Sequence, residues 1–281
     1  MITAKDINIR DPFVLADGGV YYLYGTRGSE CWGKGTGLDV YVSRDLVNFE
    51  EPRVVFTPPE GFWADKNFWA PEVHKYDGAY YMFVSFKADG KCRGTQILKA
   101  DSPLGPFKLH SDGPVTPRDW ECLDGTLYIE RSEDNRPYIV FCHEWVQITD
   151  GTVCALKLSK DLKKAEGEPV VLFHASEAPW IVDIRGGNYV TDGPFMYTDD
   201  EGKITLLWSS FGTEGYTLAV AKSGSNTIKG PWVQRPELLF SKDGGHGMLF
   251  KAYDGRVMGT LHSPNINGEE RPYFFDVTGK I

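Results

Sequence analysis

DPFVLADGGVYYLYGT, residues 11–26, decides the fold, because its pattern returns four more times along the chain. The pattern is a small or acidic residue, a short apolar strand, a polar turn and an aromatic-rich strand. The further copies are APEVHKYDGAYYMFVSF (70–86), DGTLYIERSEDNRPYIVFCH (124–143), DGPFMYTDDEGKITLLWSSF (192–211) and GMLFKAYDGRVMGTLHS (247–263). Asp-Gly between alternating apolar runs, as in the first, second and fifth copies, is a strong short-range signal for a β-hairpin.

Each hairpin is followed by a third strand-like segment, and four of the five continue into an outer one. The third segments are DVYVSRDL (39–46), TQILKADSP (95–103), VCALKLSKDL (153–162), TLAVAKSGS (217–225) and PYFFDV (272–277). No long window has helical periodicity. Five repeats of three to four strands predict an all-β fold, a five-bladed β-propeller formed as one domain by residues 1–281. We expect residues 1–10 to complete the last, three-stranded blade.

Composition excludes several classes of function. The net charge of −9 argues against nucleic acid, whose binding depends on Lys and Arg neutralising phosphates. No apolar run reaches the ~18 residues that span a bilayer. The N-terminal residues contain no signal peptide, which indicates a cytoplasmic protein, or a periplasmic or secreted one if a leader was removed. Phosphorolysis would need a cationic phosphate pocket. The nearest candidates for one, Arg10 and Arg185, form no obvious cluster.

Three of the five repeats begin with aspartate, namely Asp11, Asp124 and Asp192. In a propeller, the innermost strands line the central channel, so these three carboxyls should meet at one mouth of it. Converging acids repel and desolvate one another, and a blade has no structural need for them. Two carboxyls with separated pKa values can protonate a leaving oxygen and activate a water, which is what glycoside hydrolysis requires.

Aromatic residues make up 14% of the chain, which suits the stacking of sugar rings. We expect tryptophans in the loops that precede or follow the inner strands to rim the channel. His246, in Gly244-Gly245-His246-Gly247, would either hold water or a cation in the channel or serve as a hydrogen-bonded turn histidine. The candidates for substrate binding are Trp63, Phe68, Trp69, Glu144, Trp145 and Arg185.

Arg10-Asp11-Pro12, Trp69-Ala70-Pro71-Glu72-Val73 and the later Asp-Gly and x-Gly-Pro strands resemble glycoside hydrolase family 43 along essentially the whole chain. The resemblance implies a five-bladed propeller and inverting hydrolysis of arabinose- or xylose-containing oligosaccharides or polysaccharides. By position, it implies that Asp11 is the general base and that Asp124 orients the proton donor and raises its pKa. His246 matches the family's axial histidine, which implies a calcium or sodium ion in the channel and no organic cofactor.

The family's Glu-Gly-Pro motif reads Asp192-Gly193-Pro194 in this chain. Aspartate is one methylene shorter, which sets the carboxyl roughly 1–1.5 Å back. We expect Asp192 to be the general acid, with Glu144 and Glu214 as alternatives. An inverting enzyme should hold the Asp11 and Asp192 carboxyls about 6.5–9.5 Å apart.

The predicted activity is exo-acting removal of terminal sugars. α-L-Arabinofuranosyl is the first choice of sugar, and β-D-xylosyl and β-D-galactofuranosyl are the alternatives. A carbohydrate-binding propeller without catalysis is the alternative function.

Overall fold

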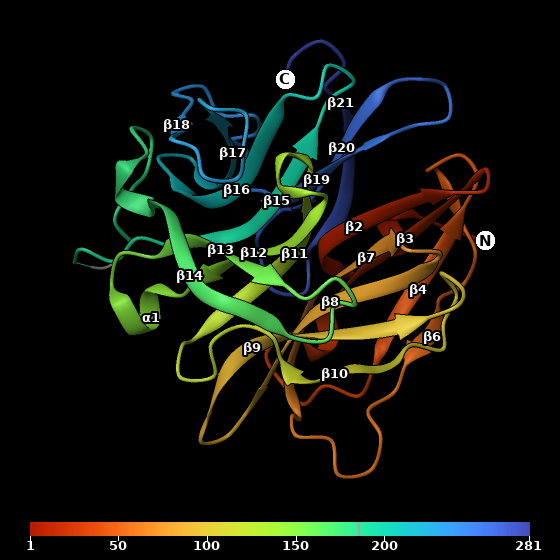
Figure 1. Ribbon diagram of the computed structural model, residues 1–281. Coiled ribbons are helices and arrows are strands. Elements are labelled where there is room, and N and C mark those ends of the chain that lie inside the picture. Colours follow the sequence, from red (N-terminus) through yellow and green to blue (C-terminus); the bar gives the residue numbers. More distant parts are fainter. Residues whose placement is uncertain (185) are drawn as a thin grey trace.

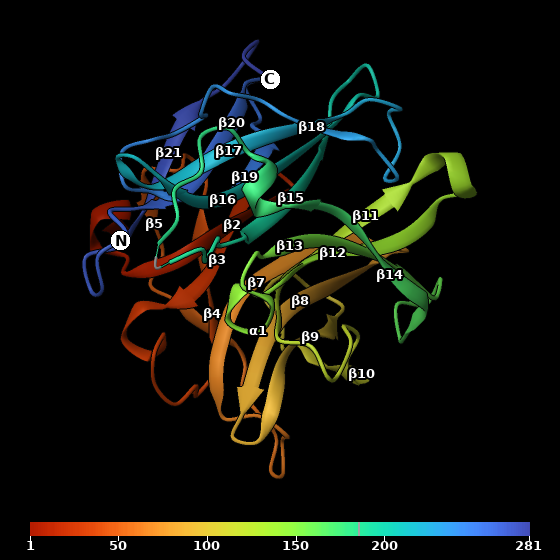
Figure 2. The same ribbon diagram turned by 90° about the vertical axis from the view of Figure 1, so that its left-hand side faces the viewer.

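Five β-sheets stand in a ring around a common axis, each forming one blade of a propeller (Figures 1 and 2). This computed structural model describes residues 1–184 and 186–281. The predicted all-β class and the five-bladed propeller are confirmed. Among the described residues, no helix has the length and apolar character needed to cross a bilayer.

Blades 1, 2 and 3 come from the first 174 residues. Blade 1 contains β2 (Ile9–Asp17), β3 (Val20–Arg27) and β4 (Leu38–Ser43), with β1 (Ile2–Thr3), β5 (Asn48–Phe49) and β6 (Arg53–Phe56) on its outer side. Blade 2 contains β7 (Lys66–Tyr76), β8 (Ala79–Ala88), β9 (Lys91–Ala100) and β10 (Lys108–Pro114). Blade 3 contains β11 (Cys122–Glu130), β12 (Arg136–His143), β13 (Thr152–Leu158) and β14 (Ala165–His174).

Blades 4 and 5 follow in the same antiparallel order, from the axis outward. Blade 4 contains β15 (Asp192–Thr198), β16 (Ile204–Gly212), β17 (Gly215–Ser223) and β18 (Trp232–Gln234). Blade 5 contains β19 (Gly245–Lys251), β20 (Val257–Ser263) and β21 (Arg271–Asp276). The helices are short: α1 (Trp145–Ile148) and the 3-10 turns η1 (Ala4–Asp6), η2 (Gly28–Glu30), η3 (Arg131–Glu133) and η4 (Ala175–Glu177).

The hairpin that joins β7 to β8 shows how the sequence determines the turns. Tyr76 pairs with Ala79, so the connection is the two residues Asp77 and Gly78. Both have positive φ, 44° and 75°, as the tight hairpin turn that matches strand twist requires. The Asp-Gly signal in the sequence therefore marks the turn correctly.

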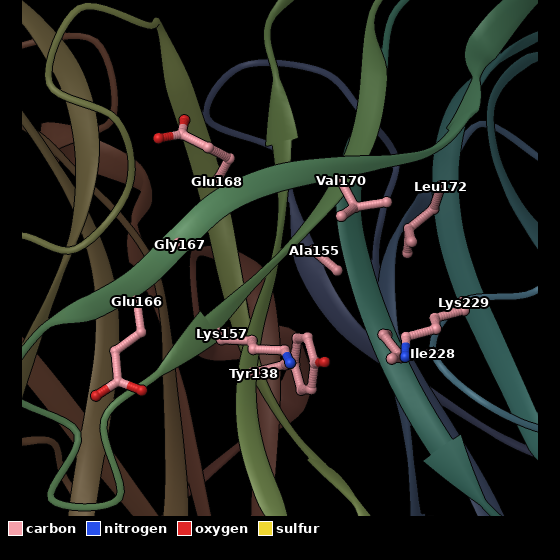
Figure 3. Close-up of a pocket in the computed structure, with 10 residues that line it drawn as sticks. All are labelled: Tyr138, Ala155, Lys157, Glu166, Gly167, Glu168, Val170, Leu172, Ile228 and Lys229. Atoms are coloured by element: carbon pink, nitrogen blue, oxygen red, sulfur yellow. The ribbon is translucent and has the colours of Figure 1, made fainter. Parts of the chain in front are cut away.

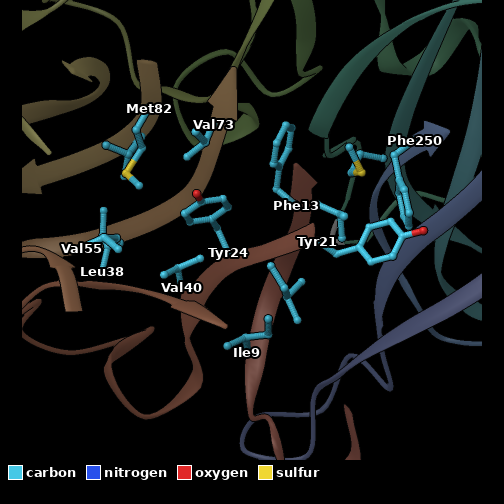
Figure 4. Close-up of a cluster of buried hydrophobic side chains, with 14 of the residues drawn as sticks. Ile9, Phe13, Tyr21, Tyr24, Leu38, Val40, Val55, Val73, Met82 and Phe250 are labelled. Carbon is cyan, nitrogen blue, oxygen red and sulfur yellow. The ribbon is translucent and has the colours of Figure 1, made fainter. Parts of the chain in front are cut away.

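The hydrophobic core lies between the blades, where the faces of neighbouring sheets meet. Figure 4 shows one part of it, which contains Ile9 and Phe13 of blade 1, Val73 of blade 2 and Phe250 of blade 5. A second cluster, between blades 3 and 4, contains the fully buried Trp208. Each blade therefore depends on its neighbours to bury its apolar faces.

The prediction that residues 1–10 complete the last blade is wrong. β1 pairs with β5 of blade 1, through Ile2 opposite Phe49. The turn of η1, in which the Asp6 carboxylate accepts a hydrogen bond from the Thr3 amide, directs the chain back over blade 1. Where the first and last blades meet, Arg10 Nη1 lies 2.7 Å from Glu270 Oε1, in the loop that precedes β21.

A β-bulge interrupts the inner strand of every blade near its start. The pairing register shifts after Arg10, Trp69, Leu123, Asp192 and Gly245. The residue that follows each shift has positive φ: Asp11 (54°), Ala70 (48°), Asp124 (58°), Gly193 (50°) and His246 (49°). Asp11 and Asp124 therefore occupy equivalent positions, whereas Asp192 stands one residue earlier. The expectation of three equivalent acids is corrected to two acids on bulges and one beside a bulge.

Candidate active site

A cavity of about 520 Å³ opens at the end of the ring where the inner strands begin. Asp11, Asp124, Asp192 and His246 line it, so the structure brings together the three predicted carboxyls and the predicted axial histidine. Three of the predicted substrate-binding residues, Trp69, Glu144 and Trp145, line the same cavity.

Hydrogen bonds to the backbone hold the bulges in place. In three blades the bulge amide donates to a hydroxyl on the second strand of the preceding blade: Ala70 to Thr26 (2.8 Å), Asp124 to Ser85 (2.9 Å) and His246 to Ser209 (2.7 Å). In blade 1, the Asp11 amide donates to His262 Nδ1 (3.2 Å) in the same way. Blade 4 differs, because the Gly193 amide donates to the Asp124 carboxylate at 2.9 Å. The bulges therefore fix both the backbone and one of the acids.

Asp11 is held as an ionised carboxylate. The Thr26 hydroxyl donates to its Oδ2 at 2.6 Å, and His246 Nδ1 lies 3.2 Å from its Oδ1. Burial by itself raises the pKa of Asp11, but His246, Arg10 and the Thr26 hydrogen bond outweigh burial and hold the pKa below its usual value. A carboxylate that keeps its charge at low pH can accept a proton from water.

Asp124 and Asp192 are shifted in the opposite direction. Burial, followed by the charge of Asp11, raises the pKa of Asp124 well above its usual value. Burial, followed by the charge of Asp124, raises the pKa of Asp192 to about 7. The pKa of Asp11 is therefore lowered while those of Asp124 and Asp192 in the same cavity are raised, and such a separation of pKa values is what acid–base catalysis needs.

An ion pair forms the wall of the cavity beside these acids. Arg93 Nη1 contacts Glu144 Oε2, and the Arg93 guanidinium lies 4.3 Å from the centre of the Trp69 ring. Burial raises the pKa of Glu144, although Arg93 partly offsets that effect. Because Glu144 is engaged with an arginine, it is less suited than Asp192 to donate a proton.

Two predicted rim residues lie elsewhere. Phe68 is buried in the core, with its ring centre 4.7 Å from that of Phe86. Trp63 donates a hydrogen bond to Gln96 at 2.6 Å and faces a separate hollow on blade 2. Glu214, an alternative acid, is exposed and accepts a hydrogen bond from Ser241 at 3.3 Å, away from the cavity. Arg185 lies outside the described residues.

The sequence analysis missed several residues that line the cavity. Trp32 is 64% exposed, and its ring meets that of Trp69 edge to face at 5.3 Å. Tyr216 donates a hydrogen bond to Asp192 Oδ2 at 3.1 Å. Asn265 and Asn267 enter from the loop after β20. The sequence did offer one signal for Trp32, because a tryptophan directly before the glycine-rich stretch at residues 33–37 is expected to lie in a loop.

The side chains around His246 offer few ligands for the expected cation. The Nδ1 of His246 faces Asp11 Oδ1 at 3.2 Å and Asp124 Oδ2 at 3.6 Å. Across residues 1–184 and 186–281, no group of three or more His, Cys, Asp or Glu side chains is arranged to hold a metal ion. These side chains alone do not fit a bound cation, so an ion beside His246 would need backbone or water oxygens as its other ligands.

A second hollow, of about 370 Å³, lies on the outer side of blade 3, against β14 (Figure 3). Tyr138 forms part of its lining, and the Lys157 ammonium lies 5.9 Å from the centre of that ring. Val170 and Leu172 line it from β14. None of the three aspartates reaches this hollow, so the acid chemistry belongs to the axial cavity.

A propeller with three aspartates in an axial cavity has the acid and base groups that glycoside hydrolysis requires. The model of the glycosyl hydrolases family 43 matches residues 6–274, and the chain belongs to that family. Its members are glycoside hydrolases, so the predicted family and enzyme class are confirmed.

Individual relatives agree with this assignment. The crystal structure of endo-arabinase from Bacteroides thetaiotaomicron VPI-5482 is 42% identical, with a TM-score of 0.90, and the match covers 98% of this chain and 96% of that chain. Extracellular exo-α-(1→5)-L-arabinofuranosidase ArbA of Cellvibrio japonicus is 24% identical over 296 residues, which cover 96% of this chain and 78% of that protein. Extracellular endo-α-(1→5)-L-arabinanase 1 of Bacillus subtilis is 24% identical over 169 residues, which cover 57% of this chain and about half (49%) of that protein.

Proposed function

We propose that this chain is an inverting, exo-acting glycosidase that releases terminal α-L-arabinofuranosyl units from arabinose-containing glycans. The observation that carries the proposal is the opposite pKa shift of Asp11 and Asp192 within one cavity. The names of two relatives that match along most of the chain, an endo-arabinase and an exo-arabinofuranosidase, support arabinose as the sugar.

The proposed reaction is a single displacement. Asp11 accepts a proton from water as the water oxygen bonds to the anomeric carbon. The glycosidic C–O bond breaks on the opposite side, and the proton of Asp192 passes to the departing oxygen. Each turnover leaves Asp11 protonated and Asp192 ionised, and exchange with solvent restores both.

Asp124 has a supporting part in this proposal. Its Oδ2 accepts the hydrogen bond of the Gly193 amide, which fixes the backbone directly after Asp192. When Asp124 is ionised, its charge raises the pKa of Asp192, an effect second only to burial. Asp124 would therefore keep the donor protonated and in position without touching the reacting atoms.

The test is hydrolysis of nitrophenyl α-L-arabinofuranoside, β-D-xyloside and β-D-galactofuranoside, with the anomeric product followed by NMR. We expect the arabinofuranoside to be cleaved fastest, with inversion. Asp11→Ala should abolish turnover in a folded protein. Asp17→Ala is the matched control, because Asp17 ends the same strand β2 and does not line the cavity. Full activity of Asp11→Ala on every glycoside would refute the base assignment.

Endo-acting cleavage of arabinan is the second candidate, because the endo-arabinase match is 42% identical over 98% of this chain. The products formed early from linear arabinan distinguish the two modes. An exo-acting enzyme releases one short product from the start, whereas an endo-acting one first produces a ladder of oligosaccharides and lowers viscosity. A ladder would overturn the exo proposal and leave the acid and base roles unchanged.

We also propose that a calcium or sodium ion binds beside His246 through backbone or water oxygens. No step of the reaction above depends on it. The measurement is the melting temperature after chelation and after calcium or sodium is added back. A wild-type melting temperature that neither treatment changes would refute the proposal, as would an equally large response in His246→Ala.

A further inference from the structure

The predicted proton donor is anchored differently from the other two acids. Asp11 and Asp124 stand on bulges and accept hydrogen bonds from Thr26 and from the Gly193 amide. Asp192 stands one residue before its bulge, as the first residue of β15. Within the described residues, the one hydrogen bond to its carboxyl comes from the Tyr216 hydroxyl, which donates to Oδ2 at 3.1 Å.

Tyr216 itself has little freedom to move. It is 2% exposed, and its ring stacks on the buried His262 ring, with centres 5.5 Å apart and planes 23° from parallel. Gly245 lies against the other ring atoms, because a Cβ at that position would come within 2.6 Å of Tyr216 Cε1. The main chain of Tyr216 is bonded to Asp243 and Gly244. The hydroxyl is therefore presented from a rigid base.

We propose that Tyr216 is the positioning residue for the proton donor: its hydroxyl holds Oδ2 of Asp192 and thereby leaves the transferable proton on Oδ1. The inference rests on the proposed function, in which Asp192 is the general acid. Because Oδ2 accepts the tyrosine hydrogen, the acid proton must reside on Oδ1, which has no hydrogen-bond partner in the described part of the chain. A short side chain with one oxygen held has a single productive orientation toward the substrate.

The charges around the pair agree with this arrangement. Burial, and after it the negative charges of Asp192 and Asp11, raise the pKa of Tyr216 well above its usual value, so the phenol remains a donor. Asp124 and Glu144 favour the protonated form of Asp192, while His246 and the Tyr216 hydrogen bond favour the ionised form. Tyr216 thus also stabilises the carboxylate that remains after proton transfer.

The experiment compares Tyr216→Phe with Tyr24→Phe. The control also removes a buried hydroxyl, one that donates to Pro103 O at 2.6 Å in the core of blade 1, away from the cavity. We expect Tyr216→Phe to lose about 10- to 100-fold in kcat on an arabino-oligosaccharide, whose leaving group needs a proton, and at most about 3-fold on dinitrophenyl arabinofuranoside. The alkaline limb of its kcat/KM profile should move to higher pH. Tyr24→Phe should change neither.

Equal losses on the two substrates, together with an unmoved alkaline limb, would overturn the positioning role. Asp192→Asn separates this failure from failure of the proposed function. If Asp192→Asn kept full activity on the oligosaccharide, the assignment of the acid would fall and the inference with it. If Asp192→Asn lost that activity while Tyr216→Phe behaved as the control, only the role of Tyr216 would be refuted.

Discussion

Replacing Asp192 by asparagine should stabilise the protein, and the gain should grow with pH. Burial, aided by the charge of Asp124, raises the pKa of Asp192 from 3.8 to about 7. The folded state therefore holds this proton more tightly than the unfolded state. The stability contributed by this tighter proton binding is present at low pH and is lost as pH rises through about 7. Asparagine has nearly the same shape, can still accept from Tyr216 and does not ionise.

The magnitude follows from the size of the shift. One pKa unit corresponds to about 1.36 kcal/mol, and the shift of Asp192 is about 3 units. Integrated over pH, Asp192→Asn should raise the free energy of unfolding by about 4 kcal/mol at pH 8 and about 2 kcal/mol at pH 5. The difference of about 2 kcal/mol between the two pH values is the quantity to measure, because effects of shape cancel from it.

Urea denaturation of both proteins at pH 5 and pH 8 measures that difference. Asp11→Asn is the opposite control in the same cavity. The pKa of Asp11 is lowered, so its stabilisation is present above its unfolded pKa of about 3.8. Asp11→Asn should therefore destabilise the protein at pH 5, where Asp192→Asn should stabilise it. A gain for Asp192→Asn that is independent of pH, or absent at pH 8, would refute the electrostatic account of the cavity.

Three further predictions concern activity and stability. The kcat/KM should fall above pH about 7 as Asp192 loses its proton. At the acid end, kcat/KM should fall only below the ordinary pKa of an aspartate, because the pKa of Asp11 is lowered. A pH series on nitrophenyl arabinofuranoside measures both limbs. Trp32→Ala should raise the KM for arabino-oligosaccharides about 10-fold, because the exposed Trp32 ring offers a stacking surface in the cavity. The kcat and the melting temperature should not change. An unchanged KM would contradict this role of Trp32. Trp208→Ala should cost about 3–5 kcal/mol in urea denaturation, because the ring is fully buried; a loss below about 1 kcal/mol would contradict the packing between blades 3 and 4.

The fold was predictable because each blade is a local structure. Hairpins such as Asp77-Gly78 connect strands that are adjacent in the sequence, so turn chemistry and alternating apolar residues are enough to find them. The number of blades then follows from the number of repeats. The pairing of β1 with β5 was not predictable, because it depends on the η1 turn and on which blade edge the chain meets.

The site was most predictable where a residue stands at the bulge of an inner strand, and less so elsewhere. Asp11, Asp124 and His246 reach the cavity because every inner strand begins at the same end of the axis. Trp63 lies shortly before β7 and Phe68 lies within it, yet a hydrogen bond to Gln96 and packing against Phe86 hold the two side chains away from the cavity. Sequence distance from a strand does not determine the direction in which a loop folds.

Ala70 separates what the fold needs from what the chemistry needs. It occupies the bulge of blade 2 with φ of 48°, the same conformation that Asp11 and Asp124 adopt, and it carries no functional group. A non-glycine residue with positive φ costs stability, so the bulge in all five blades must serve the architecture, where it starts each inner strand at the axis. The strain is therefore not a signature of catalysis. The chemistry lies in which side chains stand on this common bulge, and in the one acid, Asp192, that stands beside it.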